Sequence, residues 1–319
     1  MRPLLLSCLV LGVAAAGAQA AGGPVAPVQG GAGVSPPGSS LNWVAIRAGH
    51  DTVVQRVRSD SGFVERSRPI AGAWGVPGAA YDGSNTGVSF DEHTLVLAAM
   101  RTPSSPTRLL LVDGRSLRPR ARLTLPGYAT VDAISPDGRW LYLIRYRSIR
   151  DNDYEVRAYD LAHRRLLRAP IVDPREPDEK MQGLPMTRTT SADGRWAYTL
   201  YARPGDAPFI HALDTVGRTA ACIDLDGLDS ESIGEDRLVL AGGTLRVAGP
   251  AGPEALVDTR TFAVRRPAAR VAAAPAPAPA QRASSDGGGG ASWRLALLAL
   301  VPIAGLAVVA RRRRQARSA

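Results

Sequence analysis

The segment from Ser135 to Tyr146 reads SPDGRWLYLIRY, and the segment from Ser191 to Tyr201 reads SADGRWAYTLY. A tight turn followed by a strand-like run therefore occurs twice in one chain. Weaker copies begin at Ser89 and Ser232, so successive starting serines are 46, 56 and 41 residues apart. Repeats of about 40 to 50 residues are typical of β-propeller blades, each of which is one small sheet.

The residues of the strongest copy explain its local structure. Pro136 fixes φ at the second position of the turn, and Asp137 and Gly138 favour a type I turn. Alternate residues of the following strand point to opposite faces of the sheet. One face carries Trp140, Tyr142, Ile144 and Tyr146, and the other carries Leu141 and Leu143. Because both faces are apolar, the pattern predicts a sheet that is covered on both sides.

An apolar residue followed by Asp marks the end of a second β-rich run in each copy. These pairs are Val112-Asp113, Tyr159-Asp160, Leu213-Asp214 and Val257-Asp258. A turn and a further strand-like run follow each pair, so one unit is an antiparallel meander of about four strands. A fifth, degenerate unit begins at Asn42 and lacks the opening turn. We therefore predict an all-β fold, a β-propeller of about five four-stranded blades.

The turn-and-strand motif and the later apolar-Asp pair resemble the blades of YncE-like and WD40-like or TolB-like β-propellers. The resemblance covers roughly Asn42 to Arg266 and implies a propeller fold. It implies little about activity, because such propellers include lactonases, cofactor binders and scaffolds. A β-sandwich with repeated turns is the alternative. Two copies are degraded, since Glu92 replaces the turn Gly and Gly234-Glu235 replaces Asp-Gly.

The N-terminal end of the chain is typical of an exported protein. Arg2 precedes an apolar run and the small-residue motif Ala18-Gln19-Ala20, which predicts a signal peptide. The Pro/Gly-rich segment that follows predicts a disordered leader, and the Pro/Ala-rich then Gly/Ser-rich segment after the propeller predicts a stalk. The predicted boundaries are signal peptide 1–20, leader 21–40, propeller ectodomain 41–266 and stalk 267–292.

The C-terminal end predicts one transmembrane helix over residues 293–310. No charge occurs from Leu295 to Ala310, and Arg311 to Arg314 follow directly. Because arginines favour the cytoplasmic side, the basic tail 311–319 is expected in the cytoplasm and the propeller outside the cell. The predicted location is therefore the cell membrane, with a single pass.

This tail also resembles prokaryotic sorting signals of the Gly-Gly type. In that family a Gly/Ser-rich stretch, here SSDGGGGAS from Ser284 to Ser292, precedes a short apolar helix and an arginine cluster. The resemblance implies that a rhomboid-type membrane protease cuts the chain near the glycines. A permanent anchor with a flexible linker is the alternative.

The charge of the chain gives no support for a nucleic-acid partner. The net charge of +10 comes mainly from Arg2 and the tail arginines, which leaves the ectodomain only weakly basic. High pI is therefore no argument for nucleic-acid binding. We expect no nucleic-acid partner for a protein that is exported.

One acidic cluster is a candidate metal site. Its residues are Asp224, Asp226, Asp229 and Glu231. Carboxylates are ligands for Ca²⁺ or another divalent ion, but Gly227 falls too early for an EF-hand loop. A solvated loop between blades is the alternative. No other cofactor is predicted, and no sequence motif assigns a catalytic residue.

The loop from Arg147 to Tyr154 is the first candidate for a partner surface. It joins the two middle strands of the best-formed blade and carries side chains that make adaptable polar contacts. The residues are Arg147, Arg150, Asp151, Asn152, Asp153 and Tyr154. A charged surface loop without a partner is the alternative.

These features predict a cell-surface, membrane-anchored propeller that acts as a binding or scaffolding module rather than as an enzyme. Its expected partner is an extracellular protein or a cell-envelope glycan. One alternative is a lactonase-type hydrolase, in which side chains of several blades hold a metal at the propeller axis and activate water. A structural envelope protein without a ligand is the other.

Overall fold

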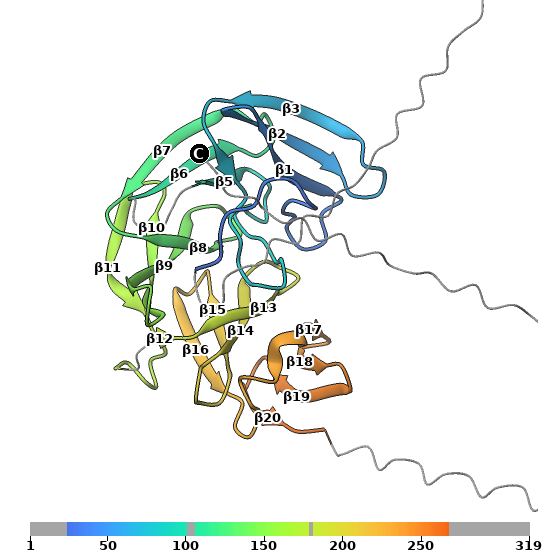
Figure 1. Ribbon diagram of the computed structural model, residues 1–319, viewed down its shortest axis with the longest axis vertical. Helices are drawn as coiled ribbons and strands as arrows, with labels where there is room; N and C mark the ends of the chain where they lie inside the picture. The colour runs from blue at the N-terminus through green and yellow to red at the C-terminus, as the bar shows by residue number, and fades with distance from the viewer. Residues whose placement is uncertain (1–23, 101–105, 179–180, 268–319) are drawn as a thin grey trace, which may run out of the picture. The chain divides into compact units, whose positions relative to one another are not determined.

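The computed structural model describes residues 24–100, 106–178 and 181–267, which belong to one compact unit, Met1–Ala269. These residues form five antiparallel sheets and one 3₁₀ helix, Ile233–Glu235. Figure 1 shows the sheets in chain order, from β1–β3 in blue to β17–β20 in orange. The described part of the chain is therefore nearly all-β, as predicted.

The sheets are meanders whose strands follow chain order. The first sheet contains β1 (Leu41–Ala48), β2 (Asp51–Arg58) and β3 (Val64–Ile70). The second contains β4 (Trp74–Gly75), β5 (Thr94–Ala99), β6 (Thr107–Asp113) and β7 (Pro119–Leu125). The third contains β8 (Ala129–Ile134), β9 (Trp140–Ser148), β10 (Asp153–Asp160) and β11 (Arg165–Ile171), with β12 (Met181–Gln182) also paired to β10.

The remaining two sheets have four strands each. The fourth contains β13 (Leu184–Thr190), β14 (Trp196–Ala202), β15 (Phe209–Asp214) and β16 (Thr219–Asp224). The fifth contains β17 (Arg237–Ala241), β18 (Thr244–Gly249), β19 (Gly252–Asp258) and β20 (Val264–Arg265).

Apolar clusters join each sheet to the next one along the chain. Trp43 packs with Leu95 between the first and second sheets, and Tyr198 packs with Leu245 between the fourth and fifth. In β9, the face from Trp140 to Tyr146 packs toward the fourth sheet, whereas Leu141 and Leu143 pack toward the second. The predicted two-sided strand is confirmed. Meanders packed face to face in this way are arranged as β-propeller blades.

The repeated turn opens the second strand of the second, third and fourth sheets, before β5, β9 and β14. In the fifth sheet, however, Ser232 precedes the first strand, β17, through the 3₁₀ helix. The second strand, β18, instead follows a hairpin turn at Gly242 and Gly243. The prediction that Ser232 is equivalent to the other serines is therefore wrong by one strand. A similar length of chain leads into the first strand of the fifth sheet rather than into its second strand.

Residues 24–40 belong to the fold, which corrects the prediction of a disordered leader for this part of the chain. Val28 bridges to Val76, and Val34 bridges to Trp43 at the free edge of β1. The first sheet thus acquires an inner edge from the leader. Its opening turn is also present, as Ser35-Pro36-Pro37-Gly38, with Gly38 at φ 74° where the third sheet has Gly138 at φ 68°. The N-terminal boundary at residue 41 is therefore too late.

A second segment, residues 77–86, leaves the inner edge of the second sheet and reaches the fourth. The backbone N–H groups of Tyr81 and Asp82 donate to the carbonyls of Pro185 and Met186 at 2.9 and 3.0 Å. The Asn85 side chain donates to the carbonyl of Gly33 at 2.9 Å. The leader and this segment therefore fasten the inner edges of three sheets to one another.

The predicted signal peptide, stalk, transmembrane helix and tail lie outside the described residues, apart from Pro267. Among the residues that are described, no helix is long and apolar enough to cross a membrane.

Candidate functional site

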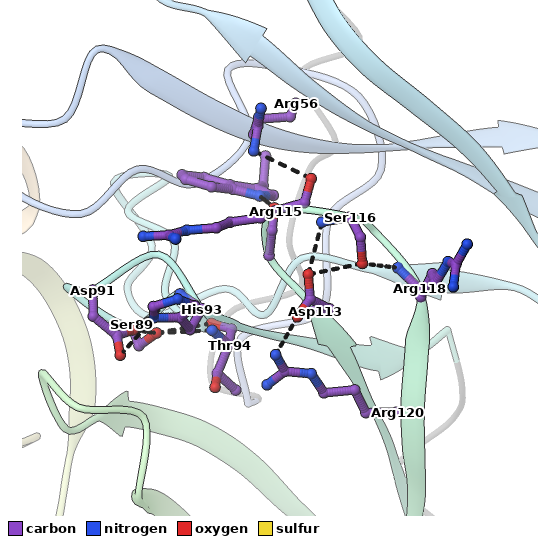
Figure 2. Close-up of polar contacts among 12 residues, drawn as sticks. Arg56, Ser89, Asp91, His93, Thr94, Asp113, Arg115, Ser116, Arg118 and Arg120 are labelled. Atoms are coloured by element: carbon purple, nitrogen blue, oxygen red, sulfur yellow. Dashed lines mark hydrogen bonds and ion pairs between the residues drawn. The ribbon is translucent and has the colours of Figure 1, made fainter.

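The repeated turns before β5, β9 and β14 are held by the same set of hydrogen bonds. The Ser89 hydroxyl donates to Asp91 Oδ1 at 2.5 Å and accepts the N–H of Thr94 at 3.0 Å, while the N–H of His93 donates to Asp91 (Figure 2). Ser135 and Ser191 make the same bonds in their own turns. The hydrogen bonds of these serine and aspartate side chains are made within the turns. The side chains therefore stabilise the turns and are not candidates for ligand binding.

The apolar-Asp pairs serve a similar purpose at the next turn. Asp113 accepts the N–H of Ser116 at 2.7 Å and its hydroxyl at 2.8 Å, and it pairs with Arg120 (Figure 2). These bonds, led by the Ser116 N–H, lower the pKa of Asp113 to about 2. Asp160, Asp214 and Asp258 accept two backbone N–H groups each. The recurring aspartates are turn-forming residues.

A group of arginines comes from the Asp113 turn, from β7 of the same sheet, and from β2 and β3 of the first sheet. We call it the arginine surface; its members are Arg56, Arg66, Arg68, Arg115, Arg118, Arg120 and Arg122. Because side chains alternate along a strand, Arg120 and Arg122 lie on the face of β7 opposite Ala121 and Leu123, which pack toward the third sheet. They therefore face the first sheet.

The first sheet turns its arginines toward the same space. Arg56 follows Val54, and Arg68 precedes Ile70, at a spacing of two residues, and both apolar residues pack toward the second sheet. Arg56 donates to the carbonyl of Arg115 at 3.2 Å, and Arg68 donates to that of Ser116 at 3.4 Å. Arg56 of the first sheet thus lies against the turn that carries Arg115 in the second sheet (Figure 2).

Few acidic groups balance these arginines. Glu65 pairs with Arg56 at 3.0 Å, and Asp113 pairs with Arg120. Arg56 also lies directly opposite Arg66 in the β2–β3 register, and like charges in that position repel. Within the described ranges, the exposed side chains of Arg66, Arg115, Arg118 and Arg122 have no polar partner. The surface therefore carries a surplus of positive charge.

The arginine surface was not predicted from the sequence, although part of it appears there as a pattern of closely spaced arginines. The run RSLRPRAR from Arg115 to Arg122 places arginines at alternate positions of a strand. The contribution of β2 and β3 could not be read from the sequence, because it depends on how the first two sheets face one another.

The predicted acidic cluster is not assembled into a metal site. Asp224, at the end of β16, pairs with Arg203 at 2.5 Å, and Asp229 accepts the N–H of Glu231 within a turn. Asp226 is exposed, and its carbonyl accepts a bond from Arg266. Across the described residues, no three His, Cys, Asp or Glu side chains lie close enough to hold a metal ion.

The predicted partner loop is a short hairpin between β9 and β10, which are the middle strands of their sheet as expected. Arg147 pairs with Asp153 at 2.6 Å, and Asp151 accepts the Ser148 hydroxyl at 2.7 Å. Tyr154 is 1% exposed within the core between the third and fourth sheets. Tyr154 therefore cannot contact a partner, whereas Arg150, Asp151 and Asn152 remain at the surface or partly exposed.

The inner edges of the third and fourth sheets carry a buried ion pair. Arg188 donates to Asp132 Oδ1 at 2.8 Å, with side-chain exposures of 5% and 2%. Asp132 lies where the β8–β9 register shifts, and such a bulge can re-aim a side chain. Nearby His211 is 2% exposed, and burial lowers its pKa. Arg188 therefore compensates the charge of Asp132, although Asp132 Oδ2 has no hydrogen-bond partner among the described residues.

The sequence matches no family model and no curated protein. Similar solved structures include the β-propeller domain of Myceliophteria thermophila Swd1, at 12% identity and TM-score 0.40, covering 79% of this chain and 73% of that one. TolB from Acinetobacter baumannii matches at 14% identity and TM-score 0.34, covering 71% and 56%. BamB from Moraxella catarrhalis matches at 16% and 0.40, covering 76% and 65%.

These similarities concern the kind of fold alone. The chain spans less than two thirds of the length of TolB and BamB. The function of this protein must therefore be argued from its own residues.

Proposed function

We propose that this protein is a binding module that holds an anionic glycan of the cell envelope on its arginine surface. The observation that carries the proposal is the surplus of exposed arginines that two sheets direct to one surface. Guanidinium groups form paired hydrogen bonds with carboxylate, phosphate and sulfate groups. A polymer that repeats such groups can engage several arginines at once, which multiplies individually weak contacts.

The proposed location of the partner rests on the predicted ends of the chain. The predicted export signal over 1–20 and the predicted transmembrane segment 293–310 with its basic tail support display of the propeller outside the membrane. Protease added to intact cells is expected to release a propeller fragment and to leave a C-terminal tag intact. Degradation of the tag would overturn this topology.

Binding is tested with fluorescently labelled heparin as a soluble anionic glycan and with dextran as a neutral one. The test variant replaces Arg66, Arg115, Arg118 and Arg122 by Gln. The control variant replaces Arg165, Arg168, Arg246 and Arg260 by Gln; these arginines are also exposed but lie on β11, on β18 and in the β19–β20 turn. Both variants lose the same charge, so any difference reports on position.

We expect the test variant to bind heparin at least about tenfold more weakly than the control variant, because clustered charges create a stronger local field than dispersed ones. An equal loss of heparin affinity in both variants would show that the binding is non-specific electrostatic attraction. No heparin binding by the unaltered protein would favour the ligand-free structural role. The hydrolase alternative has no observation in its support within the described residues.

A further inference from the structure

A pair of carboxylates in the fifth sheet is outside the arginine surface and outside the acidic cluster discussed above. Asp236 follows the 3₁₀ helix and immediately precedes β17, and its residue exposure is 1%. Neither of its carboxylate oxygens has a hydrogen-bond partner within the described part of the chain. A buried carboxylate without donors is costly, so this group needs a partner that the protein itself does not supply.

The second carboxylate is that of Glu254 in β19, and Gly249 at the end of β18 makes room for both. A Cβ at Gly249 would overlap Glu254 Oε1 and lie 3.0 Å from Asp236 Oδ1. The two carboxylates therefore converge on the space beside Gly249. Burial and the charge of Glu254 raise the pKa of Asp236 to about 6, which agrees with two acidic groups facing one another.

The nearest cationic side chain does not bond to either carboxylate. Arg237 donates through Nη1 to the backbone carbonyls of Glu235 and Asp236, at 3.2 and 2.9 Å. The positive charge of Arg237 lowers the pKa of Asp236 less than burial and the charge of Glu254 raise it. Two negative groups are thus directed into one space while the neighbouring arginine is engaged by the main chain.

We propose that Asp236 and Glu254 bind one Ca²⁺ ion that fastens the hairpin of β18 and β19 to the start of β17. Ca²⁺ is a hard cation that takes carboxylate oxygens together with backbone carbonyls and water. A site with only two carboxylates is weak, of the order of 10⁻⁴ to 10⁻³ M as in other extracellular modules. This affinity range suits the display outside the membrane that is proposed above.

The test measures Ca²⁺ binding and thermal unfolding of the full-length protein after removal of metals with EDTA, at pH 7.5. Equilibrium dialysis is expected to find one bound Ca²⁺ per chain in the unaltered protein and none in Asp236→Asn or Glu254→Gln. At about ten times the Kd, Ca²⁺ should raise Tm of the unaltered protein by about 3–6 °C. The two variants should show no shift.

Two further variants separate a metal site from general charge effects. Gly249→Ala keeps both carboxylates but fills the space between them, and it should also abolish binding. Asp226→Asn combined with Glu231→Gln removes two exposed acidic groups, and it should bind Ca²⁺ like the unaltered protein. The proposal is overturned if the unaltered protein takes up no Ca²⁺ at 10-fold the expected Kd, roughly 10 mM, or if Asp236→Asn still binds one ion.

Discussion

Asp132 in the third sheet and Asp236 in the fifth are equally hidden from water, each at 1% exposure, but they have opposite neighbours. Asp132 faces Arg188 at 2.8 Å, whereas Asp236 faces Glu254 and has no donor among the described residues. Burial of a carboxylate is unfavourable in both places. The charge of the neighbouring side chain therefore decides whether the carboxylate stabilises or destabilises the folded state. The arginine surface is a third case, in which the surplus positive charge stays exposed and is solvated by water.

The largest expected change in stability comes from removing the positive charge of the buried Asp132–Arg188 ion pair. Arg188→Met leaves the buried Asp132 carboxylate without its partner, so we expect a loss of about 3–5 kcal/mol in the free energy of unfolding. Urea denaturation at pH 7.5 measures this. The double variant Arg188→Met, Asp132→Leu should recover most of the loss, because it removes both charges. Unchanged stability of the single variant would contradict the comparison.

In the fifth sheet, removal of a buried charge is expected to increase the free energy of unfolding rather than to decrease it. Asp236→Asn removes a buried negative charge that faces Glu254, so in EDTA at pH 7.5 we expect stabilisation by about 1 kcal/mol. The same urea denaturation measures it. A loss comparable to that of Arg188→Met would show that Asp236 has a compensating partner after all.

The pH dependence of the same variant sharpens this result. The pKa of Asp236 is about 6 in the folded state and 3.8 in its reference state, so the folded protein binds the proton more tightly. This group therefore contributes stability that is complete below pH 3.8 and is lost as pH rises through 6. The advantage of Asp236→Asn over the unaltered protein should shrink between pH 7 and pH 4. A constant difference would exclude titration of Asp236.

The smallest change in the free energy of unfolding is expected at the Asp113 turn, where the carboxylate already accepts hydrogen bonds from Ser116 and pairs with Arg120. Asp113→Asn keeps an acceptor for Ser116 and loses the charge that pairs with Arg120, so we expect a loss of about 0.5–1 kcal/mol at pH 7. Because the pKa of Asp113 is lowered to about 2, its contribution is present above pH 4 and lost toward pH 2. Stability measured against pH for both proteins would detect this, and a loss above 3 kcal/mol would contradict it.

Sequence patterns predicted what depends on neighbours in the chain. The turn at Ser135 and the two faces of β9 were predictable, because turn chemistry and strand alternation are local properties. The opening turn of the first sheet was missed because it lies one residue farther from its strand. The burial of Tyr154 was predictable in principle, since Tyr154, Val156 and Ala158 alternate on one apolar face.

Contacts between sheets could not be predicted in the same way. Asp132 and Arg188 are 56 residues apart, and they meet because a register shift in β8 directs Asp132 toward the fourth sheet. The crossing of residues 77–86 to β13 likewise depends on the positions of two separate sheets. The arginine surface and the carboxylates beside Gly249 share this origin, so each candidate site required the structure.

The central claim, that exposed arginines of the first two sheets bind an anionic polymer, is tested most directly by the salt dependence of heparin binding. Each arginine that contacts the polymer displaces bound counterions, so log Kd should rise linearly with log [NaCl]. Replacing Arg66, Arg115, Arg118 and Arg122 by Gln should reduce this slope clearly, whereas the control set of Arg165, Arg168, Arg246 and Arg260 should leave it unchanged. Equal slopes for the unaltered protein and the test variant would contradict the claim.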